Sequence, residues 1–334
     1  HTIRANDTDY EVENIIIATG SEPHKLQFEG SDLDRVFDSN AFLEDYGIEP
    51  DSLLVIGGGV IGCEIASFYL QLGIPVVIVE MLERLLVNFD SDLAQKTALN
   101  LKKMGAEIFT SSRVEKVIQH DTNHVEVFWT DKKGIEVSRI VQCVLMATGR
   151  KAAVDGLTSD GFELTLDRNG ICADEAGRTQ YDNIYVAGDC RANNIQLAHL
   201  AMAQGENAVD QILGKPAGID TSVVPSCLYT CPPVASVGIN EAQAREKGLK
   251  VKVRKMPTGA NGKSIIESAP PGTIKIITDE NDVVIGGSIY GVHAPEYIST
   301  VSLAVKEKLT AARLGALIMP HPSVAESIGE AARQ

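Results

Sequence analysis

Three glycines and one glutamate have the types and spacing best suited to chemistry in this chain. Gly57, Gly59 and Gly62 form the pattern Gly-x-Gly-x-x-Gly between an apolar run and a segment with a helical pattern. In such a turn the first glycine permits a tight exit from the strand. The second lets a pyrophosphate approach the backbone, and the third lets the helix pack against the sheet. Because N–H groups and the helix dipole favour an anion there, the spacing predicts a dinucleotide-binding turn.

Glu80 extends this prediction from the pyrophosphate to a ribose. It stands 18 residues after Gly62 and directly follows a second apolar run, Val76–Val79. A carboxylate at that place accepts hydrogen bonds from both hydroxyls of an adenine ribose and repels a 2′-phosphate. We therefore expect NAD as the cofactor, with NADP disfavoured. The alternative interpretation is an ordinary strand-to-helix turn in some other α/β enzyme.

The elements that must position these residues follow from the spacing of apolar residues. The expected elements are strands at 53–56 and 76–79, helices at about 60–72 and from Asp90 or Ser91 to Gly105, and short strands at 107–110, 114–118, 124–130 and 141–148. The apolar–polar alternation of 124–129 predicts an antiparallel strand with one buried face. The pattern as a whole predicts a βαβ core that carries a small antiparallel sheet.

Composition and charge limit the partners of this chain. It has 334 residues, which is enough for two or three domains, and a formal net charge of −15 with a pI near 4.9. The acidic balance argues against nucleic acid and against anionic membrane surfaces as partners. No uninterrupted apolar stretch reaches the length needed to span a membrane.

The cysteines give no sign of a disulfide framework or of a zinc site. The chain has six, which are Cys63, Cys143, Cys172, Cys190, Cys227 and Cys231. Their scattered spacing predicts no bound metal. Cys227 and Cys231 are the only close pair, and they are either redox-active or, as we favour, two unrelated thiols beside a Pro-Pro sequence.

Two similar segments flank the predicted βαβ core. Ala18-Thr19-Gly20 ends the apolar run at 15–20, which predicts a buried strand, and Ala147-Thr148-Gly149 ends a second apolar run. This repetition suggests that the segment between them is inserted into a second domain, whose two pieces lie on either side. From about residue 221 the pattern changes to alternating strands and covering helices, which predicts an antiparallel sheet.

Several motifs together resemble those of the flavin- and nicotinamide-dependent disulfide reductases, and most closely those of the dihydrolipoamide dehydrogenases. The motifs, in order, are Ile17–Ser21, Gly57–Gly62 with Cys63-Glu64, Ala147–Arg150, Tyr185–Asp189, Leu197–His199, Val224–Ser226 with Tyr229-Thr230 and Ser236–Gly238, and His321–Glu326. The resemblance covers nearly the whole chain. It implies FAD and NAD as cofactors.

The resemblance also assigns residues to the flavin and to the nicotinamide. Gly188 and Asp189 would hold FAD, with the Asp189 carboxylate on a hydroxyl of the ribityl chain. Thr19, Gly20 and Ala198 would also belong to the FAD site. The helix that begins near Ala198 would direct its N-terminus at the flavin ring. There its dipole would stabilise the negative charge of a reduced flavin. Glu64 and Gly149 would lie on the nicotinamide side.

A histidine and a glutamate near the C-terminus resemble the acid–base pair of this family. His321 would take a proton from a dithiol substrate, and Glu326 would orient and polarise its imidazole. In the family this pair reaches the flavin of the partner subunit, so a homodimer is implied. The implied substrate is a lipoyl-bearing protein or a small dithiol.

The expected fold is therefore α/β, with a Rossmann-like NAD-binding domain inserted in a partial FAD-binding domain and followed by an α+β dimerisation domain. The expected domains are 1–37 with 148–220 for FAD, 38–147 for NAD, and 221–334 for dimerisation.

Two family features do not occur in the sequence. The family begins with its own glycine-rich FAD motif and a redox pair of cysteines separated by four residues, and neither is present. Since His1 also falls in what looks like mid-domain sequence, we expect a fragment that is by itself inactive. The expected compartment is the cytoplasm, or the mitochondrial matrix if the source is eukaryotic.

Two alternatives to the dihydrolipoamide interpretation stay open. One is another disulfide reductase of the same architecture. The other is a flavin-free module that binds NAD and dimerises without turnover.

Overall fold

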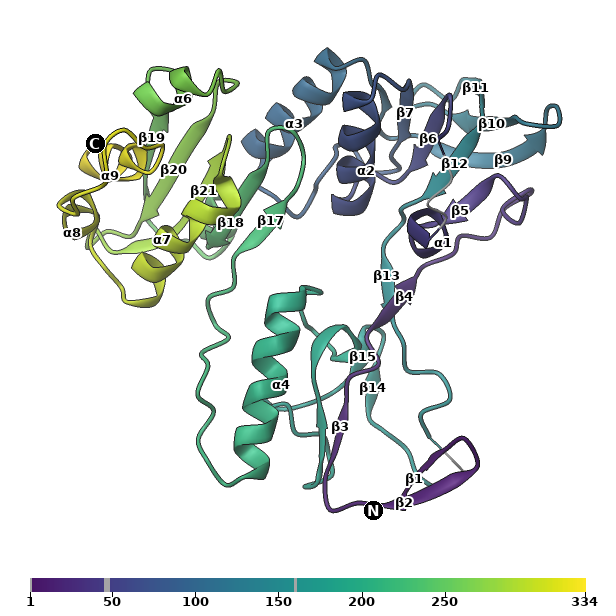
Figure 1. Ribbon diagram of the computed structural model, residues 1–334, viewed down its shortest axis with the longest axis horizontal. Coiled ribbons are helices and arrows are strands. Elements are labelled where there is room, and N and C mark those ends of the chain that lie inside the picture. The colour runs from purple at the N-terminus through teal and green to yellow at the C-terminus, as the bar shows by residue number, and fades with distance from the viewer. Residues whose placement is uncertain (1, 45–48, 159–160) are drawn as a thin grey trace. The chain divides into compact units, whose positions relative to one another are not determined.

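The computed structural model describes residues 2–44, 49–158 and 161–334 (Figure 1). It divides into two compact units, the first made of His1–His24 and Arg150–Ser222 and the second of Lys25–Gly149 and Val223–Gln334. Among the described residues, no helix is long and apolar enough to cross a membrane. The mixed α/β architecture confirms the expected fold class. The predicted boundaries near residues 37, 147 and 220 stay a prediction.

A five-stranded parallel sheet forms the centre of the second unit. Its order is β5 (Val36–Asp38), β12 (Cys143–Met146), β6 (Leu53–Ile56), β7 (Val76–Val79) and β8 (Glu107–Phe109). Every residue of β6, β7 and β12 is buried, as expected for apolar strands covered on both faces. α2 (Val60–Gln71) joins β6 to β7, and α3 (Ser91–Lys103) precedes β8 (Figure 1). The predicted βαβ core is confirmed.

A three-stranded antiparallel sheet covers part of this core. Its order is β11 (Glu136–Val141), β10 (Val125–Thr130) and β9 (Arg113–Gln119). Burial alternates along β10, with Val125, Val127 and Trp129 buried against apolar residues of β6 and β7. The predicted one-face-buried strand is therefore confirmed. β11 lies largely between the strands expected at 124–130 and 141–148, where no element was expected.

The C-terminal part of the second unit is a five-stranded antiparallel sheet with helices packed on it. The strands run in the order β17 (Ser226–Leu228), β18 (Val234–Gly238), β21 (Val284–Tyr290), β20 (Thr273–Thr278) and β19 (Lys252–Pro257). The helices are α5 (Glu241–Glu246), α6 (Gly262–Ile266), α7 (Ala294–Lys306), α8 (Ala311–Gly315) and α9 (Glu326–Arg333). α7 contacts β18 and β21, and α9 contacts β19 and β20 (Figure 1). Their apolar faces enclose one core, which confirms the predicted change in architecture.

The first unit consists of small sheets and one long helix. Its strands pair as β1 (Thr2–Ala5) with β2 (Thr8–Glu11), β3 (Ile15–Ile17) with β16 (Ile184–Val186), β4 (Ser21–Pro23) with β13 (Arg150–Ala152), and β14 (Leu166–Asp167) with β15 (Gly170–Ile171). The helix α4 (Ala198–Ile212) follows the short helix η1 (Gly188–Cys190). We expected the apolar run at 15–20 to be a buried strand. Within the described residues it is instead a short strand with Ile16 38% exposed, because β16 is the only strand beside it.

Candidate functional site

The glycine-rich turn between β6 and α2 has the conformation that its spacing predicts. Gly57 has a φ of +108°, and a Cβ there would lie 2.4 Å from the carbonyl oxygen of Ala147. A Cβ on Gly62 would lie 2.1 Å from the carbonyl oxygen of Gly57, so only glycine lets α2 approach the strand. A Cβ on Gly59 would meet no heavy atom within 4 Å. The turn is therefore closed by protein at its first and third glycines and open at its second.

Glu80 lies at the same edge of the sheet, because β6 and β7 are parallel neighbours. Its side chain is 9% exposed. Oε2 accepts the N–H of Gly58 at 2.5 Å, and Oε1 accepts the N–H of Leu82 at 2.6 Å. These bonds fix the carboxylate beside the turn and leave it further lone pairs for a ribose.

Gly58 is a site residue that the sequence analysis missed. A Cβ there would lie 2.2 Å from Cδ2 of Leu85 and 3.2 Å from Oε2 of Glu80. The signal was present, because the turn contains three consecutive glycines and the fingerprint uses only the outer two. The middle glycine is required by the loop after β7, which packs onto the turn.

These residues fit a dinucleotide. β12 lies beside β6 on the side opposite β7, so the chain connections on the two sides of β6 run in opposite directions across the sheet. The turn after β6 therefore lies at a topological switch point, which is the usual ligand crevice of such sheets. Gly149 follows β12 with a φ of +101°, and a Cβ there would also meet no heavy atom within 4 Å. No side chain among the described residues caps the start of α2, so its N–H groups face the open side.

Glu64 lies on α2, two residues after Gly62, and is half-buried. Its Oε1 accepts the N–H of Tyr229 at 2.7 Å. Burial raises the pKa of Glu64, and the hydrogen bond from Tyr229 offsets this only in part. A carboxyl group with a raised pKa at the turn is the kind of group that ligand sites contain.

In the first unit, the predicted flavin residues gather around η1. Ser21 Oγ donates to Asp189 Oδ2 at 2.7 Å, and Arg150 Nε donates to Ser21 Oγ at 2.7 Å. The N–H of Gly188, which has a φ of +79°, donates to Oε1 of the buried Gln204 at 2.9 Å. Gln204 is a second residue that sequence analysis missed, since a lone glutamine inside a helix gives no signal.

Thr19, Gly20 and Ala198 complete this group. Thr19 Oγ1 donates to the carbonyl of Ala153 at 2.6 Å, and the N–H of Ala153 donates to the carbonyl of Gly20 at 3.0 Å. Ala198 is the first residue of α4, and no side chain among the described residues caps that end. Such a helix start, with a carboxylate held nearby by Ser21, fits an electron-rich, hydroxyl-bearing cofactor.

His321 and Glu326 lie together in the second unit. Nδ1 of His321 lies 2.9 Å from Oε1 of Glu326, and Oε2 of Glu326 accepts the N–H of Ser323 at 2.9 Å. The bond from Ser323 and the bond with His321 lower the pKa of Glu326. The imidazole is 80% exposed, so its Nε2 edge is accessible to a partner molecule.

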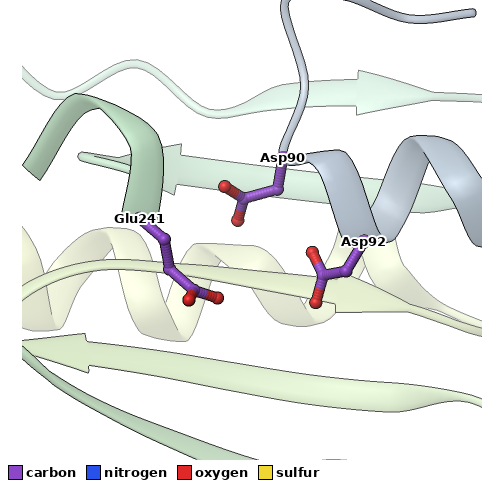
Figure 2. A group of neighbouring side chains, drawn as sticks. All are labelled: Asp90, Asp92 and Glu241. Atoms are coloured by element: carbon purple, nitrogen blue, oxygen red, sulfur yellow. The ribbon is translucent and has the colours of Figure 1, made fainter. Parts of the chain in front are cut away.

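Three carboxylates elsewhere in the second unit resemble a cation site. Asp90, Asp92 and Glu241 offer oxygens within 4.8 Å of one another, and Figure 2 shows the three side chains converging from the start of α3 and from α5. However, Lys275 Nζ lies 3.0 Å from Asp90, 2.8 Å from Asp92 and 2.7 Å from Glu241. The lysine ammonium therefore occupies the position between them, and we assign the cluster to an ion-pair network.

Comparisons with known proteins show which family this chain resembles. The family model described as pyridine nucleotide-disulphide oxidoreductase matches residues 1–205, and the model of its dimerisation domain matches 224–332. A dihydrolipoyl dehydrogenase of Bacillus subtilis is 37% identical over 328 residues, covering 97% of this chain and 68% of the relative. A second one from the same organism is 33% identical over 320 residues, covering 95% and 67%.

Solved structures give the same result. The HOCl-induced flavoprotein disulfide reductase RclA from Escherichia coli matches with a TM-score of 0.90 and 28% identity over 100% of this chain and 76% of its own. LpdA from Mycobacterium tuberculosis matches with a TM-score of 0.88 and 28% identity, covering 99% and 72%.

The chain belongs to the pyridine nucleotide-disulphide oxidoreductases. It is thus of the class of flavoprotein disulfide oxidoreductases, which use FAD and a pyridine nucleotide, and the match to the dimerisation domain supports a homodimer. The expected family is confirmed. The roles of individual site residues stay predictions.

Proposed function

We propose that this chain belongs to a dihydrolipoyl dehydrogenase, an enzyme that oxidises protein-bound dihydrolipoamide and passes hydride to NAD. The observation that carries the proposal is the pairing of His321 with Glu326 at 2.9 Å in a chain 33–37% identical to dihydrolipoyl dehydrogenases. An accessible imidazole held by a carboxylate is the arrangement that general-base chemistry on a thiol requires.

In this proposal each partner of the pair has one task. Glu326 holds Nδ1 of His321 and so directs Nε2 outward, where it accepts the proton of a dithiol. The N–H of Ser323 fixes the second carboxylate oxygen, which prevents Glu326 from rotating away from the imidazole. His321 then carries the proton while the thiolate reacts, and Glu326 stabilises the imidazolium.

The proposed nucleotide is NAD rather than NADP. Gly57, Gly59 and Gly62 would hold the pyrophosphate, and Glu80 would bind both ribose hydroxyls. The burial of Glu80 supports this, because its carboxylate is fixed by two backbone N–H groups and would repel a 2′-phosphate. Glu64 and Gly149 would lie beside the nicotinamide.

FAD, when bound, supplies the hydride relay between a disulfide and the nicotinamide. Gly188, Asp189, Thr19, Gly20 and Ala198 would hold it. Asp189 would bind a ribityl hydroxyl, with Ser21 fixing its other side, and the start of α4 would stabilise negative charge on the ring.

We also propose that the chain does not turn over by itself. Its sequence has no second Gly-x-Gly-x-x-Gly segment for FAD and no pair of cysteines separated by four residues. A second candidate is another disulfide reductase of the family, which the similarity to RclA favours, at a TM-score of 0.90. The remaining candidate is a flavin-free module that binds NAD and dimerises.

Two experiments separate these functions. The complete gene product that contains these residues is assayed for NADH formation from dihydrolipoamide and NAD, with glutathione and NADP as comparison substrates. Turnover specific to dihydrolipoamide supports the proposal. Turnover with another thiol, and none with dihydrolipoamide, contradicts it. The chain itself is then purified with added FAD. Tight stoichiometric flavin with lipoamide reduction would contradict its proposed inactivity.

A further inference from the structure

The loop between β7 and α3 packs directly onto the glycine-rich turn. The N–H of Leu86 donates to the carbonyl oxygen of Gly58 at 2.9 Å, while the N–H of Gly58 donates to Glu80. Gly58 is thus held on both sides by residues of this loop and the strand end before it. The side chains of Leu85 and Leu86 are buried beneath. The shape of the loop therefore sets the position of the turn.

Leu86 adopts a backbone conformation that needs support. Its φ is +51°, in the left-handed region that residues other than Gly, Asn and Asp rarely adopt. Such a conformation persists only when the surroundings over-determine it. Since the N–H of Leu86 is the one that meets Gly58, whatever holds Leu86 also holds the turn.

The guanidinium of Arg84 binds the main-chain carbonyls of this loop. One terminal nitrogen donates to the carbonyls of Leu86 at 2.8 Å and Leu85 at 3.4 Å, and the other donates to those of Val87 at 2.8 Å and Phe89 at 3.2 Å. Five donors in a rigid fork suit arginine to this task, whereas lysine offers a single point charge. The half-buried Arg84 thus gathers the main-chain carbonyls of the segment that follows it.

We propose that Arg84 is a positioning residue for the adenine-ribose site and contributes to the choice of NAD over NADP. It acts through Leu86 on Gly58, whose N–H in turn binds the Glu80 carboxylate. The inference rests on the proposed NAD binding.

The test is calorimetric titration of the chain with NADH and with NADPH. The unchanged chain binds NADH more tightly. Arg84→Gln weakens NADH binding about five- to twentyfold, the effect of losing charged hydrogen bonds that hold a site, and it brings the NADH/NADPH affinity ratio closer to one. Arg84→Lys retains part of the preference for NADH over NADPH, because an ammonium keeps one or two of the carbonyl contacts. Arg245→Gln, at an exposed arginine of α5, leaves both affinities unchanged.

A double-mutant cycle separates positioning from general stabilisation of the loop. If Arg84 acts through Glu80, then Arg84→Gln does not change the NADH/NADPH ratio further in the Glu80→Ala background. An equal loss of both affinities with an unchanged ratio overturns the inference, as does a ratio that shifts independently of Glu80. If the unchanged chain binds NADPH as tightly as NADH, the proposed NAD preference fails and this inference fails with it.

Discussion

Nδ1 of His321 lies 2.9 Å from Oε1 of Glu326, and the second oxygen of that carboxylate is fixed by the N–H of Ser323. Glu326 is also the first residue of α9, whose inner face is buried in the C-terminal core. A solvent-facing imidazole is therefore oriented by a carboxylate that is anchored in the fold. The spacing of five residues is explained by this anchoring, since the intervening loop must turn back onto the helix start.

Replacement of His321 should affect only one half of the proposed reaction. In the complete gene product, His321→Gln should slow dithiol oxidation by about 10²- to 10⁴-fold, the range for a lost general base. Reduction of the flavin by NADH should stay nearly unchanged, and Glu326→Gln should cost less because the base remains. Stopped-flow measurement of both half-reactions checks this. His293→Gln is the matched control, because Nε2 of His293 also lies 2.9 Å from a carboxylate, that of Glu267. Equal slowing of both half-reactions would make His321 structural.

Glu326 should remain ionised to a lower pH than an ordinary glutamate. Its pKa lies below the ordinary 4.5 because the N–H of Ser323 and the imidazole of His321 both bind the charged form. A lowered pKa in the folded state contributes stability that is present above the unfolded-state pKa and is lost as pH falls through the folded-state value. Carbon NMR titration of the glutamate carboxyls measures the pKa directly. His321→Gln should raise it partway, and a titration unaffected by that change would contradict the pairing in solution.

Glu80 should determine the nucleotide preference. Glu80→Ala removes the acceptor for the ribose hydroxyls and the charge that repels a 2′-phosphate. The preference for NADH should fall by about 1–3 kcal/mol, the scale of a charged hydrogen bond or a relieved repulsion. Titration calorimetry with both nucleotides measures it. Glu83→Ala, at an exposed glutamate in the same loop, should change neither affinity. An undiminished preference in the Glu80 variant would refute the assignment.

The position and conformation of the glycine-rich turn were predictable because they depend on local sequence. β6 and β7 begin and end at the predicted residues, and α3 and α4 are followed by Gly105 and Gly214 at positive φ. The tight packing at Gly58 and the main-chain contacts of Arg84 were not predictable, because each depends on a loop conformation set by several backbone contacts. The hydrogen bond from the N–H of Gly188 to Gln204 was also not predictable, because only the folded chain brings these two residues together.

The second and third glycines of the fingerprint, Gly59 and Gly62, should separate binding from stability. Gly59→Ala adds a methyl group to a residue with φ of −75° and no heavy atom within 4 Å of the new Cβ. Its effect on stability should stay within about 1 kcal/mol, while NADH affinity falls because the methyl group blocks the pyrophosphate. Gly62→Ala places a Cβ 2.1 Å from a carbonyl oxygen and should destabilise the chain by about 1–3 kcal/mol. Thermal unfolding and NADH titration of both variants decide this, and a Gly59 variant that binds normally would contradict the pyrophosphate assignment.

Lys275 should be the most important ionic residue of the second unit. It is 2% exposed, lies on β20, and pairs with Asp90 and Asp92 at the start of α3 and with Glu241 at the start of α5. Burial lowers the pKa of Lys275, but the hydrogen bonds and charges of its partners outweigh burial and raise it overall. For Asp92 and Glu241, burial raises the pKa but the lysines lower it overall. These directions favour the charged forms of Lys275, Asp92 and Glu241 at neutral pH.

Breaking this network at the lysine should cost far more than at its exposed neighbour. Lys275→Met leaves three carboxylates without their shared cation and should lower the free energy of unfolding by about 3–5 kcal/mol. Lys255→Met removes a lysine that is 46% exposed and contacts the same Asp92 and Glu241, and it should cost below about 1 kcal/mol. Urea unfolding of both variants gives the comparison.

The pH dependence of the same network has a definite sign. Because the folded-state pKa values of Asp92 and Glu241 are lowered, their stabilisation is present above the ordinary values of 3.8 and 4.5 and is lost as pH falls through the folded-state values. The raised pKa of Lys275 gives stability that is present below 10.5 and is lost as pH rises through its folded-state value. Lys275→Met should therefore lose the part of the acid-side dependence of unfolding that Asp92 and Glu241 contribute. A variant that unfolds with the stability and pH profile of the unchanged chain would show that the bridge does not hold α3 against the sheet.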